Sequence, residues 1–105
     1  MLRSSDFRSV YDQGTRFTCA LFTAFCLSHD RQAGPRIGFT LPRALGKAVR
    51  RNRMKRRIRE AIRVRLPRIA ARWDIVINPR RSALEAQWGS IEKEVERLVS
   101  RCGNS

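Results

Sequence analysis

Cationic side chains are the residues of this sequence best suited to chemistry, and they are concentrated in one stretch. Between Arg43 and Arg72 there are thirteen Lys and Arg residues and one acid, Glu60, which gives the stretch +12 of the +14 net charge of the 105-residue chain. Arginine outnumbers lysine twenty to three, and its planar guanidinium suits bidentate contact with phosphate and stacking on bases. The charge therefore indicates a polyanionic partner, with nucleic acid as the first candidate.

The residues that a protein nuclease needs for acid-base or metal chemistry are sparse. His29 is the only histidine, so a two-histidine mechanism is excluded, and we expect His29 to be a solvated loop residue. No spacing typical of a metal site relates the aspartates, which are Asp6, Asp12, Asp30 and Asp74. Intrinsic catalysis is therefore the less favoured hypothesis.

Three cysteines, Cys19, Cys26 and Cys102, form an odd set without a Cys-x-x-Cys spacing. Such a set is typical of reduced thiols. Cys19 and Cys26 are seven residues apart, which in one regular strand places them on opposite faces, so we expect no shared zinc site. The start of the chain has no signal-peptide pattern, and no apolar run reaches the roughly 18 to 20 residues that span a bilayer. We therefore expect a cytoplasmic protein with no membrane partner.

Six elements follow from the apolar periodicity and the turn residues. Helical spacing predicts helices over residues 6–13, 52–66 and 82–102, with Gly14 ending the first helix, Pro67 the second, and a capping box from Ser82 to Glu85 opening the third. Aromatic and β-branched residues predict strands over residues 16–28, 36–41 and 73–79, the first two forming a hairpin. The order α-β-β-α-β-α predicts one α+β domain over residues 1–105, an α/β sandwich in which a small sheet packs with helices.

The helix expected over residues 52–66 has an apolar stripe and a basic face. The stripe consists of Met54, Ile58, Ala61 and Ile62. The opposite face carries Asn52, Arg56, Arg59 and Arg63. We expect Asn52 to be the N-cap of this helix. A basic amphipathic helix can also lie on a membrane or bind calmodulin, but the cations continue on both sides of this helix and no Trp-rich face accompanies them. Nucleic acid is therefore the favoured partner.

Aromatic side chains fall on two of the predicted elements. Phe7 and Tyr11 share one face of the first helix, while Phe17 and Phe25 are expected on one face of the first strand and Phe22 on the other. At most one of these strand faces packs beneath helices. The other face could stack on unpaired bases, although core packing is the simpler interpretation for each ring.

A specific motif lies within the basic stretch. Residues 48–59 read Ala-Val-x-Arg-Asn-Arg-x-Lys-Arg-x-x-Arg, which resembles the signature of the bacterial ribonuclease P protein component. Residues 6–14, 36–39 and 74–77 are similar to the N-terminal helix, second strand and last strand of that family. The resemblance implies a mixed sheet like the second domain of ribosomal protein S5, with a left-handed β-α-β crossover that carries the Arg-rich helix.

The resemblance also implies a function. With a catalytic RNA subunit, such a protein forms the endonuclease that removes the 5′ leader of precursor tRNA. The RNA subunit and its Mg²⁺ ions perform the hydrolysis, so no catalytic side chain and no metal site are expected in this chain. The implied partners are the catalytic RNA and precursor tRNA, without an obligate protein partner.

The site residues implied by the resemblance form two groups. Contacts with RNA are assigned to Arg43, Lys47, Arg51, Asn52, Arg53, Lys55, Arg56 and Arg59. A cleft between the first helix and the sheet, which holds the leader, is assigned to Phe7, Tyr11 and Phe25. Two alternatives remain, a ribosomal-type RNA-binding protein that uses the same helix and a small nuclease that cleaves RNA by itself.

Overall fold

A mixed four-stranded sheet organises the computed structural model, which describes residues 4–28 and 34–102, with side chains from residue 7 onward. The strands are β1 (Thr15–Thr18), β2 (Phe22–Ser28), β3 (Arg36–Phe39) and β4 (Trp73–Pro79), in the spatial order β1-β2-β4-β3. β2 pairs antiparallel with β1 and β4, whereas β3 pairs parallel with β4. The predicted small mixed sheet with helices is confirmed, and β1 and β3 are its two edges.

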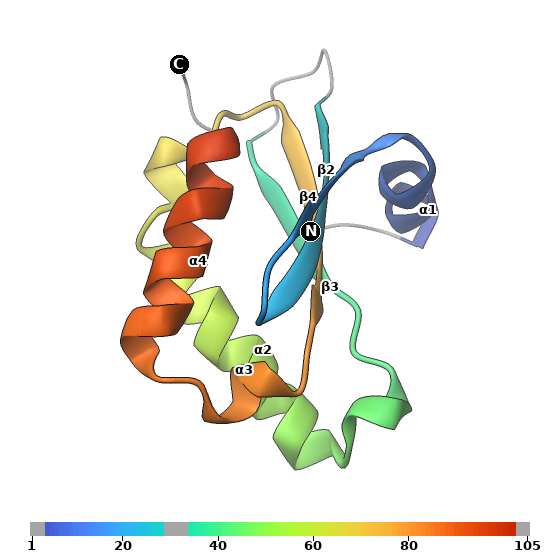
Figure 1. Cartoon of the computed structure of the whole chain (residues 1–105). Helices are drawn as coiled ribbons and strands as arrows, with labels where there is room; N and C mark the ends of the chain where they lie inside the picture. Colours follow the sequence, from blue (N-terminus) through green and yellow to red (C-terminus); the bar gives the residue numbers. More distant parts are fainter. Residues whose placement is uncertain (1–3, 29–33, 103–105) are drawn as a thin grey trace.

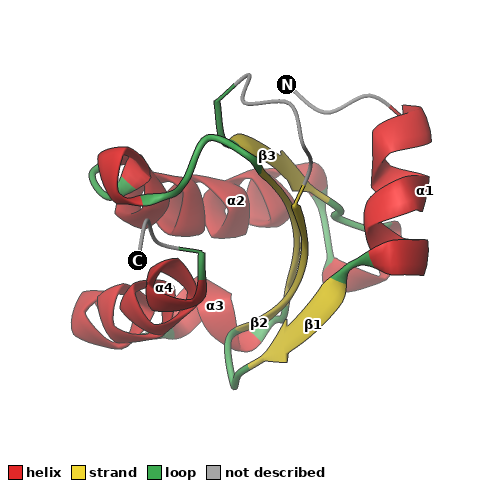
Figure 2. Ribbon diagram, turned by 90° about the horizontal axis from the view of Figure 1, so that it is seen from above, coloured by secondary structure: helices red, strands yellow, loops and turns green. Residues whose placement is uncertain are grey.

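Helices cover both faces of this sheet. They are α1 (Ser4–Gln13), α2 (Ala48–Arg63), α3 (Ser82–Glu85) and α4 (Trp88–Arg101), with short 3₁₀ turns η1 (Arg43–Leu45) and η2 (Leu66–Arg68) on either side of α2. Figure 1 shows the chain order of these elements, and Figure 2 shows α2 and α4 on one face of the sheet and α1 on the other. The main core lies under α2 and α4, and its large side chains include Phe22, Met54, Ile58, Ile75 and Ile91. No helix among the described residues is long and apolar enough to cross a membrane.

The strand expected over residues 16–28 is instead a hairpin. The chain turns between β1 and β2, where the Cys19 amide donates to the Phe22 carbonyl over 3.0 Å, and Phe17 pairs with Ala24. Folding the segment back on itself lets its two halves satisfy each other's backbone groups. The prediction of one strand was wrong because the turn contains neither Gly nor Pro, the residues that usually mark one.

The hairpin changes which side chains share a face. Phe17 and Phe22 both enter the main core, with ring centroids 6.0 Å apart, while Phe25 lies on the face under α1. The expectation that Phe17 and Phe25 share one face of a strand is therefore wrong. Cys19 and Cys26 also belong to the same core, contrary to the expected opposite faces, because alternation along one strand does not continue through a turn.

The hairpin predicted between residues 16–28 and residues 36–41 is not formed. β2 pairs with β1 and β4, and β3 pairs with β4. β4 lies between β2 and β3, and β3 reaches β4 through α2 as a parallel β-α-β crossover. An ion pair joins β3 to β4, with Arg36 donating to Asp74 over 2.8 and 2.6 Å. β4 is buried along most of its length. In the centre of the sheet its apolar side chains are covered on both faces, with Ile75 and Ile77 in the main core and Val76 under α1. A hairpin of residues 16–28 with residues 36–41 would keep β4 out of this central position.

Helix boundaries near the basic motif lie one turn earlier than expected. α2 begins after Lys47, so Asn52 is an exposed residue within the helix and not its N-cap. The predicted apolar stripe is confirmed, since Met54, Ile58, Ala61 and Ile62 are all buried. Pro67 lies in η2, where the helix has ended, as predicted. His29 and Asp30, which the sequence places in a loop, lie outside the described residues.

The helix expected over residues 82–102 is two helices. Ala86 is extended, with φ −61° and ψ 147°, and separates α3 from α4. Ser82 donates its hydroxyl to the Ala20 carbonyl over 2.6 Å instead of capping a long helix. Trp88 begins α4 and is 41% exposed, whereas Ile91, Val95 and Leu98 of the same helix are buried. The capping-box prediction was wrong because Arg81 is the N-cap and Ser82 is already helical, with its hydroxyl bonded to Ala20 in the turn after β1, a contact that the local sequence does not encode.

Candidate nucleic-acid interface

The residues assigned to RNA contact lie along α2 and in the segment that leads into it. The exposed ones are Arg43, Lys47, Asn52, Arg53, Arg56 and Arg59, and the half-buried ones are Arg51 and Lys55. Because α2 buries its apolar stripe against the sheet, its remaining surface presents these cations to solvent. The structure thus brings the predicted set together on one element and its N-terminal approach.

Arg51 differs from the other members of this set in its contacts. Its guanidinium donates to the Leu41 carbonyl over 3.1 Å, and the side chain is half-buried. This bond ties the segment after β3 to the first turns of α2. Arg51 therefore orients the start of the helix.

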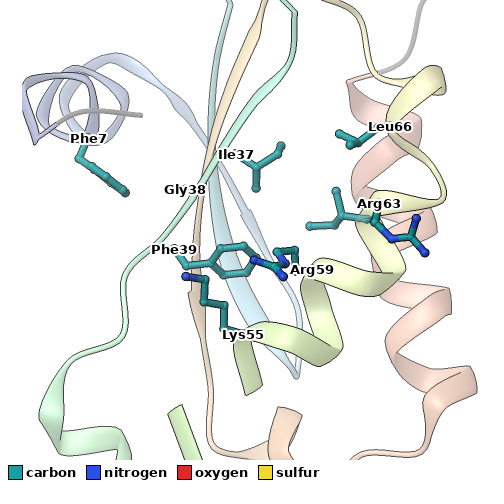
Figure 3. Close-up of a pocket in the computed structure, with 9 residues that line it drawn as sticks. Phe7, Ile37, Gly38, Phe39, Lys55, Arg59, Arg63 and Leu66 are labelled. Carbon is teal, nitrogen blue, oxygen red and sulfur yellow. The ribbon is translucent and has the colours of Figure 1, made fainter. Parts of the chain in front are cut away.

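A groove of about 480 Å³ runs between α1, the edge strand β3 and α2 (Figure 3). Its walls are contributed by Phe7, Ile37, Gly38, Phe39, Lys55, Arg59, Ile62, Arg63 and Leu66. Figure 3 shows Phe7 on one side of β3 and the α2 side chains on the other. The walls thus combine apolar and aromatic surface with cations, which is the composition that holds single-stranded nucleic acid by stacking and backbone contact.

The three aromatic residues assigned to the leader cleft lie together. Phe7, Tyr11 and Phe25 pack around Val10 and Val76 on the face of the sheet under α1. The Tyr11 and Phe25 rings meet edge to face, with centroids 4.8 Å apart. Of the three, Phe7 lines the groove, while Tyr11 and Phe25 form the half-buried cluster beside it.

The Tyr11 hydroxyl forms two hydrogen bonds. It donates to Asn78 Oδ1 over 2.8 Å and lies 2.7 Å from Thr40 Oγ1, which can donate to it in turn. These bonds join α1 to β4 and to the residue after β3. They therefore hold Phe7, one turn earlier on the same face of α1, in position beside β3.

Cations dominate the electrostatics of the groove. Arg63 forms an ion pair with Glu60 over 2.6 Å, and this contact lowers the pKa of the Glu60 carboxyl below its ordinary value, so Glu60 stays ionised and offsets Arg63. None of the ion pairs among the described residues involves Lys55 or Arg59, although the Arg59 charge also lowers the pKa of the Glu60 carboxyl. They are therefore the cations of the groove best placed to meet phosphate.

The polar side chains of the groove do not suit a protein-held Mg²⁺ ion. Mg²⁺ prefers oxygen ligands and is held through carboxylates and substrate phosphates, whereas Lys55, Arg59 and Arg63 carry positive charge. Within residues 4–28 and 34–102 no group of three or more His, Cys, Asp or Glu side chains is placed to hold a metal. A bound RNA backbone would have to supply the oxygen ligands.

The β3 wall of the groove was missed by sequence reasoning. Ile37, Gly38 and Phe39 line it because β3 is an edge strand, but the expected hairpin placed this segment beside residues 16–28. Pro42, shortly after the strand, indicates a strand end or an edge, since proline is confined to such positions, but it does not indicate which side chains line a groove.

Comparison with known proteins shows one family throughout. The family model for ribonuclease P matches residues 1–103. The chain is 39% identical over 97 residues to the ribonuclease P protein component of Symbiobacterium thermophilum, covering 92% of this chain and 84% of the relative. It is 40% identical over 95 residues to that of Picosynechococcus, covering 90% and 81%.

Solved structures show the same likeness. The Staphylococcus aureus RNase P protein superposes with a TM-score of 0.84 at 26% identity, covering 99% of this chain and 96% of that one. The Thermotoga maritima RNase P protein gives a TM-score of 0.83 at 27% identity, covering 95% and 94%. The motif on α2, the groove beside it and the matches along nearly the whole chain lead to one conclusion: this chain belongs to the ribonuclease P protein component family.

Proposed function

We propose that this chain binds the catalytic RNA of ribonuclease P through the exposed cations of α2 and holds the 5′ leader of precursor tRNA in the groove beside β3. Membership of the family makes the chain a component of a tRNA-processing ribonuclease. The observation that carries the proposal is the groove itself, which has Phe7 on one side of β3 and the cations Lys55 and Arg59 on the other. An unpaired strand of variable sequence is best held by such stacking and charge.

The protein's part in the reaction is binding and charge neutralisation. Lys55 and Arg59 screen the leader phosphates, and the exposed α2 cations screen those of the catalytic RNA. Mg²⁺, held by the RNA subunit and the substrate, supplies the activated nucleophile and charge stabilisation for phosphodiester hydrolysis. By lowering the repulsion between the two RNAs, the protein strengthens substrate binding and reduces the Mg²⁺ concentration that cleavage requires.

Cleavage of precursor tRNA at limiting Mg²⁺ tests this proposal. The three reactions contain a bacterial ribonuclease P RNA alone, the protein alone, and both together. We expect cleavage at the mature 5′ end only when both are present. Cleavage by the purified protein alone would show a protein nuclease, and no stimulation of a compatible RNA would favour the ribosomal-type alternative.

Phe7→Leu tests the groove separately from the α2 surface. Leucine keeps apolar packing but removes the ring, so we expect the holoenzyme to bind precursor tRNA about tenfold more weakly through lost stacking on a leader base. Trp88→Leu, at an exposed ring outside the groove, is the matched control and should leave binding unchanged. Binding of mature tRNA, which has no leader, should be the same for both variants and the wild type, and an equal loss there would remove the leader from the explanation.

A further inference from the structure

A second basic surface lies at the edge of the sheet opposite the groove. The groove follows β3, whereas β1 forms the other edge, and its residues Phe17 and Thr18 lie beside the last turns of α4. Lys93, Arg97 and Arg101 are exposed on α4 at intervals of four residues, so they form one stripe, about 6 Å apart along the helix axis. The motif on α2 includes none of them.

Two of these cations are arranged around a single ring. The guanidinium carbons of Arg97 and Arg101 lie 5.6 and 5.5 Å from the centroid of the Phe17 ring. Phe17 is only 5% exposed and belongs to the main core, so it is a fixed support for both side chains. Cation–π contact with a fixed ring restrains the two guanidinium groups and leaves their N–H donors available.

A pocket of about 440 Å³ opens between these side chains and β1, lined by Phe17, Thr18, Arg97, Ser100 and Arg101. We call it the arginine pocket. Thr18 and Ser100 are exposed, and because the Ser100 hydroxyl donates to the Glu96 carbonyl over 3.0 Å, Thr18 supplies the hydroxyl donor of the rim. With its one aromatic ring almost completely covered, the pocket presents cations and the Thr18 hydroxyl to solvent, which suits a phosphate and not an acyl chain or an apolar peptide.

The charge of the arginine pocket is only partly offset. Arg97 pairs with Glu94 over 2.7 Å through one nitrogen, which leaves the other donors of its guanidinium. None of the ion pairs among the described residues involves Arg101. The remaining N–H donors of these two guanidinium groups therefore suit an anion that accepts two hydrogen bonds, such as a phosphate.

We propose that the arginine pocket binds the phosphodiester backbone of RNA, as a second contact on the edge of the protein opposite the groove. The inference rests on the proposed function, because it takes the RNA to be the catalytic subunit or the precursor tRNA of the same complex. Lys93 extends the contact along α4 to the next phosphates. The protein would thus bind RNA along both edges of its sheet.

The variant Arg97→Gln/Arg101→Gln tests this inference in two binding experiments at several salt concentrations. One measures binding of the protein to ribonuclease P RNA, and the other measures binding of precursor tRNA to the assembled holoenzyme. Loss of two phosphate contacts should weaken affinity about five- to tenfold and make the log-log salt slope shallower by about 1.5 to 2. Loss in the first arm identifies the catalytic RNA as the ligand, and loss in the second alone identifies the substrate.

Arg72→Gln/Arg80→Gln is the matched control, because it removes two exposed cations outside both the groove and the arginine pocket. If the control loses as much affinity as the pocket variant, overall charge explains the effect and the site is overturned. Wild-type affinity of the pocket variant in both arms also overturns it, while the proposed function stands. If the wild-type protein binds neither RNA, the proposed function fails as well.

Two further measurements keep the test decisive if the glutamine variant unfolds. Arg97→Lys/Arg101→Lys keeps both charges and should keep the wild-type salt slope. In the wild-type protein, the Nε–H resonances of Arg97 and Arg101 should shift when RNA is added and that of Arg72 should not. Unshifted Arg97 and Arg101 signals at saturating RNA would contradict the proposal.

Discussion

Two adjacent arginines of the α2 motif have different roles. Arg56 is exposed, whereas Arg57 is half-buried and its guanidinium donates to the carbonyls of Ala83 and Leu84 over 2.7 and 2.8 Å and to that of Ala86. Arg57 thus donates hydrogen bonds to the carbonyl groups that have no partner within the helix where α3 ends. Arg57 therefore stabilises the packing of α3 on α2, while the neighbouring Arg56 is exposed to solvent.

Arg57→Ala should destabilise the protein by about 2–3 kcal/mol, because three carbonyls lose a charged donor at a half-buried site. Arg56→Ala should change the free energy of unfolding by less than about 0.5 kcal/mol, as for other exposed residues, but should reduce holoenzyme activity at low Mg²⁺. Urea unfolding followed by circular dichroism measures the first effect and precursor-tRNA cleavage the second. Equal stability of the two variants would contradict the structural role of Arg57.

At the scale of elements, an ion-pair cluster joins the segment after α2 to α4. Arg65 donates to Glu96 over 2.7 Å and lies 3.5 Å from Glu92, and Arg68 also contacts Glu96. The two guanidinium groups lower the pKa of Glu96 from 4.5 to about 2. Glu92 and Glu96 therefore tie α4 to the segment that follows α2.

This depressed pKa makes a prediction about stability and pH. Because the folded-state pKa of Glu96 lies below the unfolded value, its stabilising contribution is fully present above about pH 4.5 and is lost as the pH falls toward 2. Glu96→Gln should be less stable than the wild type at pH 7, and the difference should shrink as the pH falls through this window. Thermal unfolding of both proteins between pH 7 and 2 measures it, and a constant difference would contradict the ion pairs.

The end of α1 also depends on one close contact. A Cβ atom at Gly14 would lie 2.4 Å from the Val10 carbonyl oxygen and 3.0 Å from that of Cys26 in β2. Glycine therefore lets the helix end directly against the sheet, and this contact sets the place of Phe7.

Gly14→Ala should shift α1 away from β2, lower stability by about 1–3 kcal/mol, and weaken binding of precursor tRNA more than binding of mature tRNA. Gly89→Ala, where a Cβ meets nothing within 4 Å, is the matched control. Wild-type melting temperature and leader-dependent binding in Gly14→Ala would show that the close approach is not required.

For the whole molecule, charge distribution determines how binding depends on salt. If RNA binding neutralises about six phosphates, affinity for single-stranded RNA should fall with a log-log salt slope near −4. Filter binding or fluorescence anisotropy between about 50 and 200 mM salt would measure it. A slope near zero would mean that the +14 net charge plays no part in binding.

Local patterns in the sequence determined most of the elements and the chemical class of the site. The apolar stripe of α2, the buried strand β4 and the end of α1 at Gly14 are where periodicity and turn residues predicted them. The concentration of cations within one stretch pointed to nucleic acid, and the motif pointed to the family. Each of these signals is carried by residues close together in the chain, which is why they are readable without a structure.

The tertiary structure alone decided which segments are neighbours. It turned residues 15–28 into a hairpin, inserted β4 between β2 and β3, and so made β3 the edge that lines the groove. It also separated Arg57 from Arg56 in role and placed Arg97 and Arg101 around Phe17. These contacts join residues far apart in sequence, and strand order is set by which pairing buries apolar surface on both faces of the sheet, a property of the whole chain that no local pattern contains.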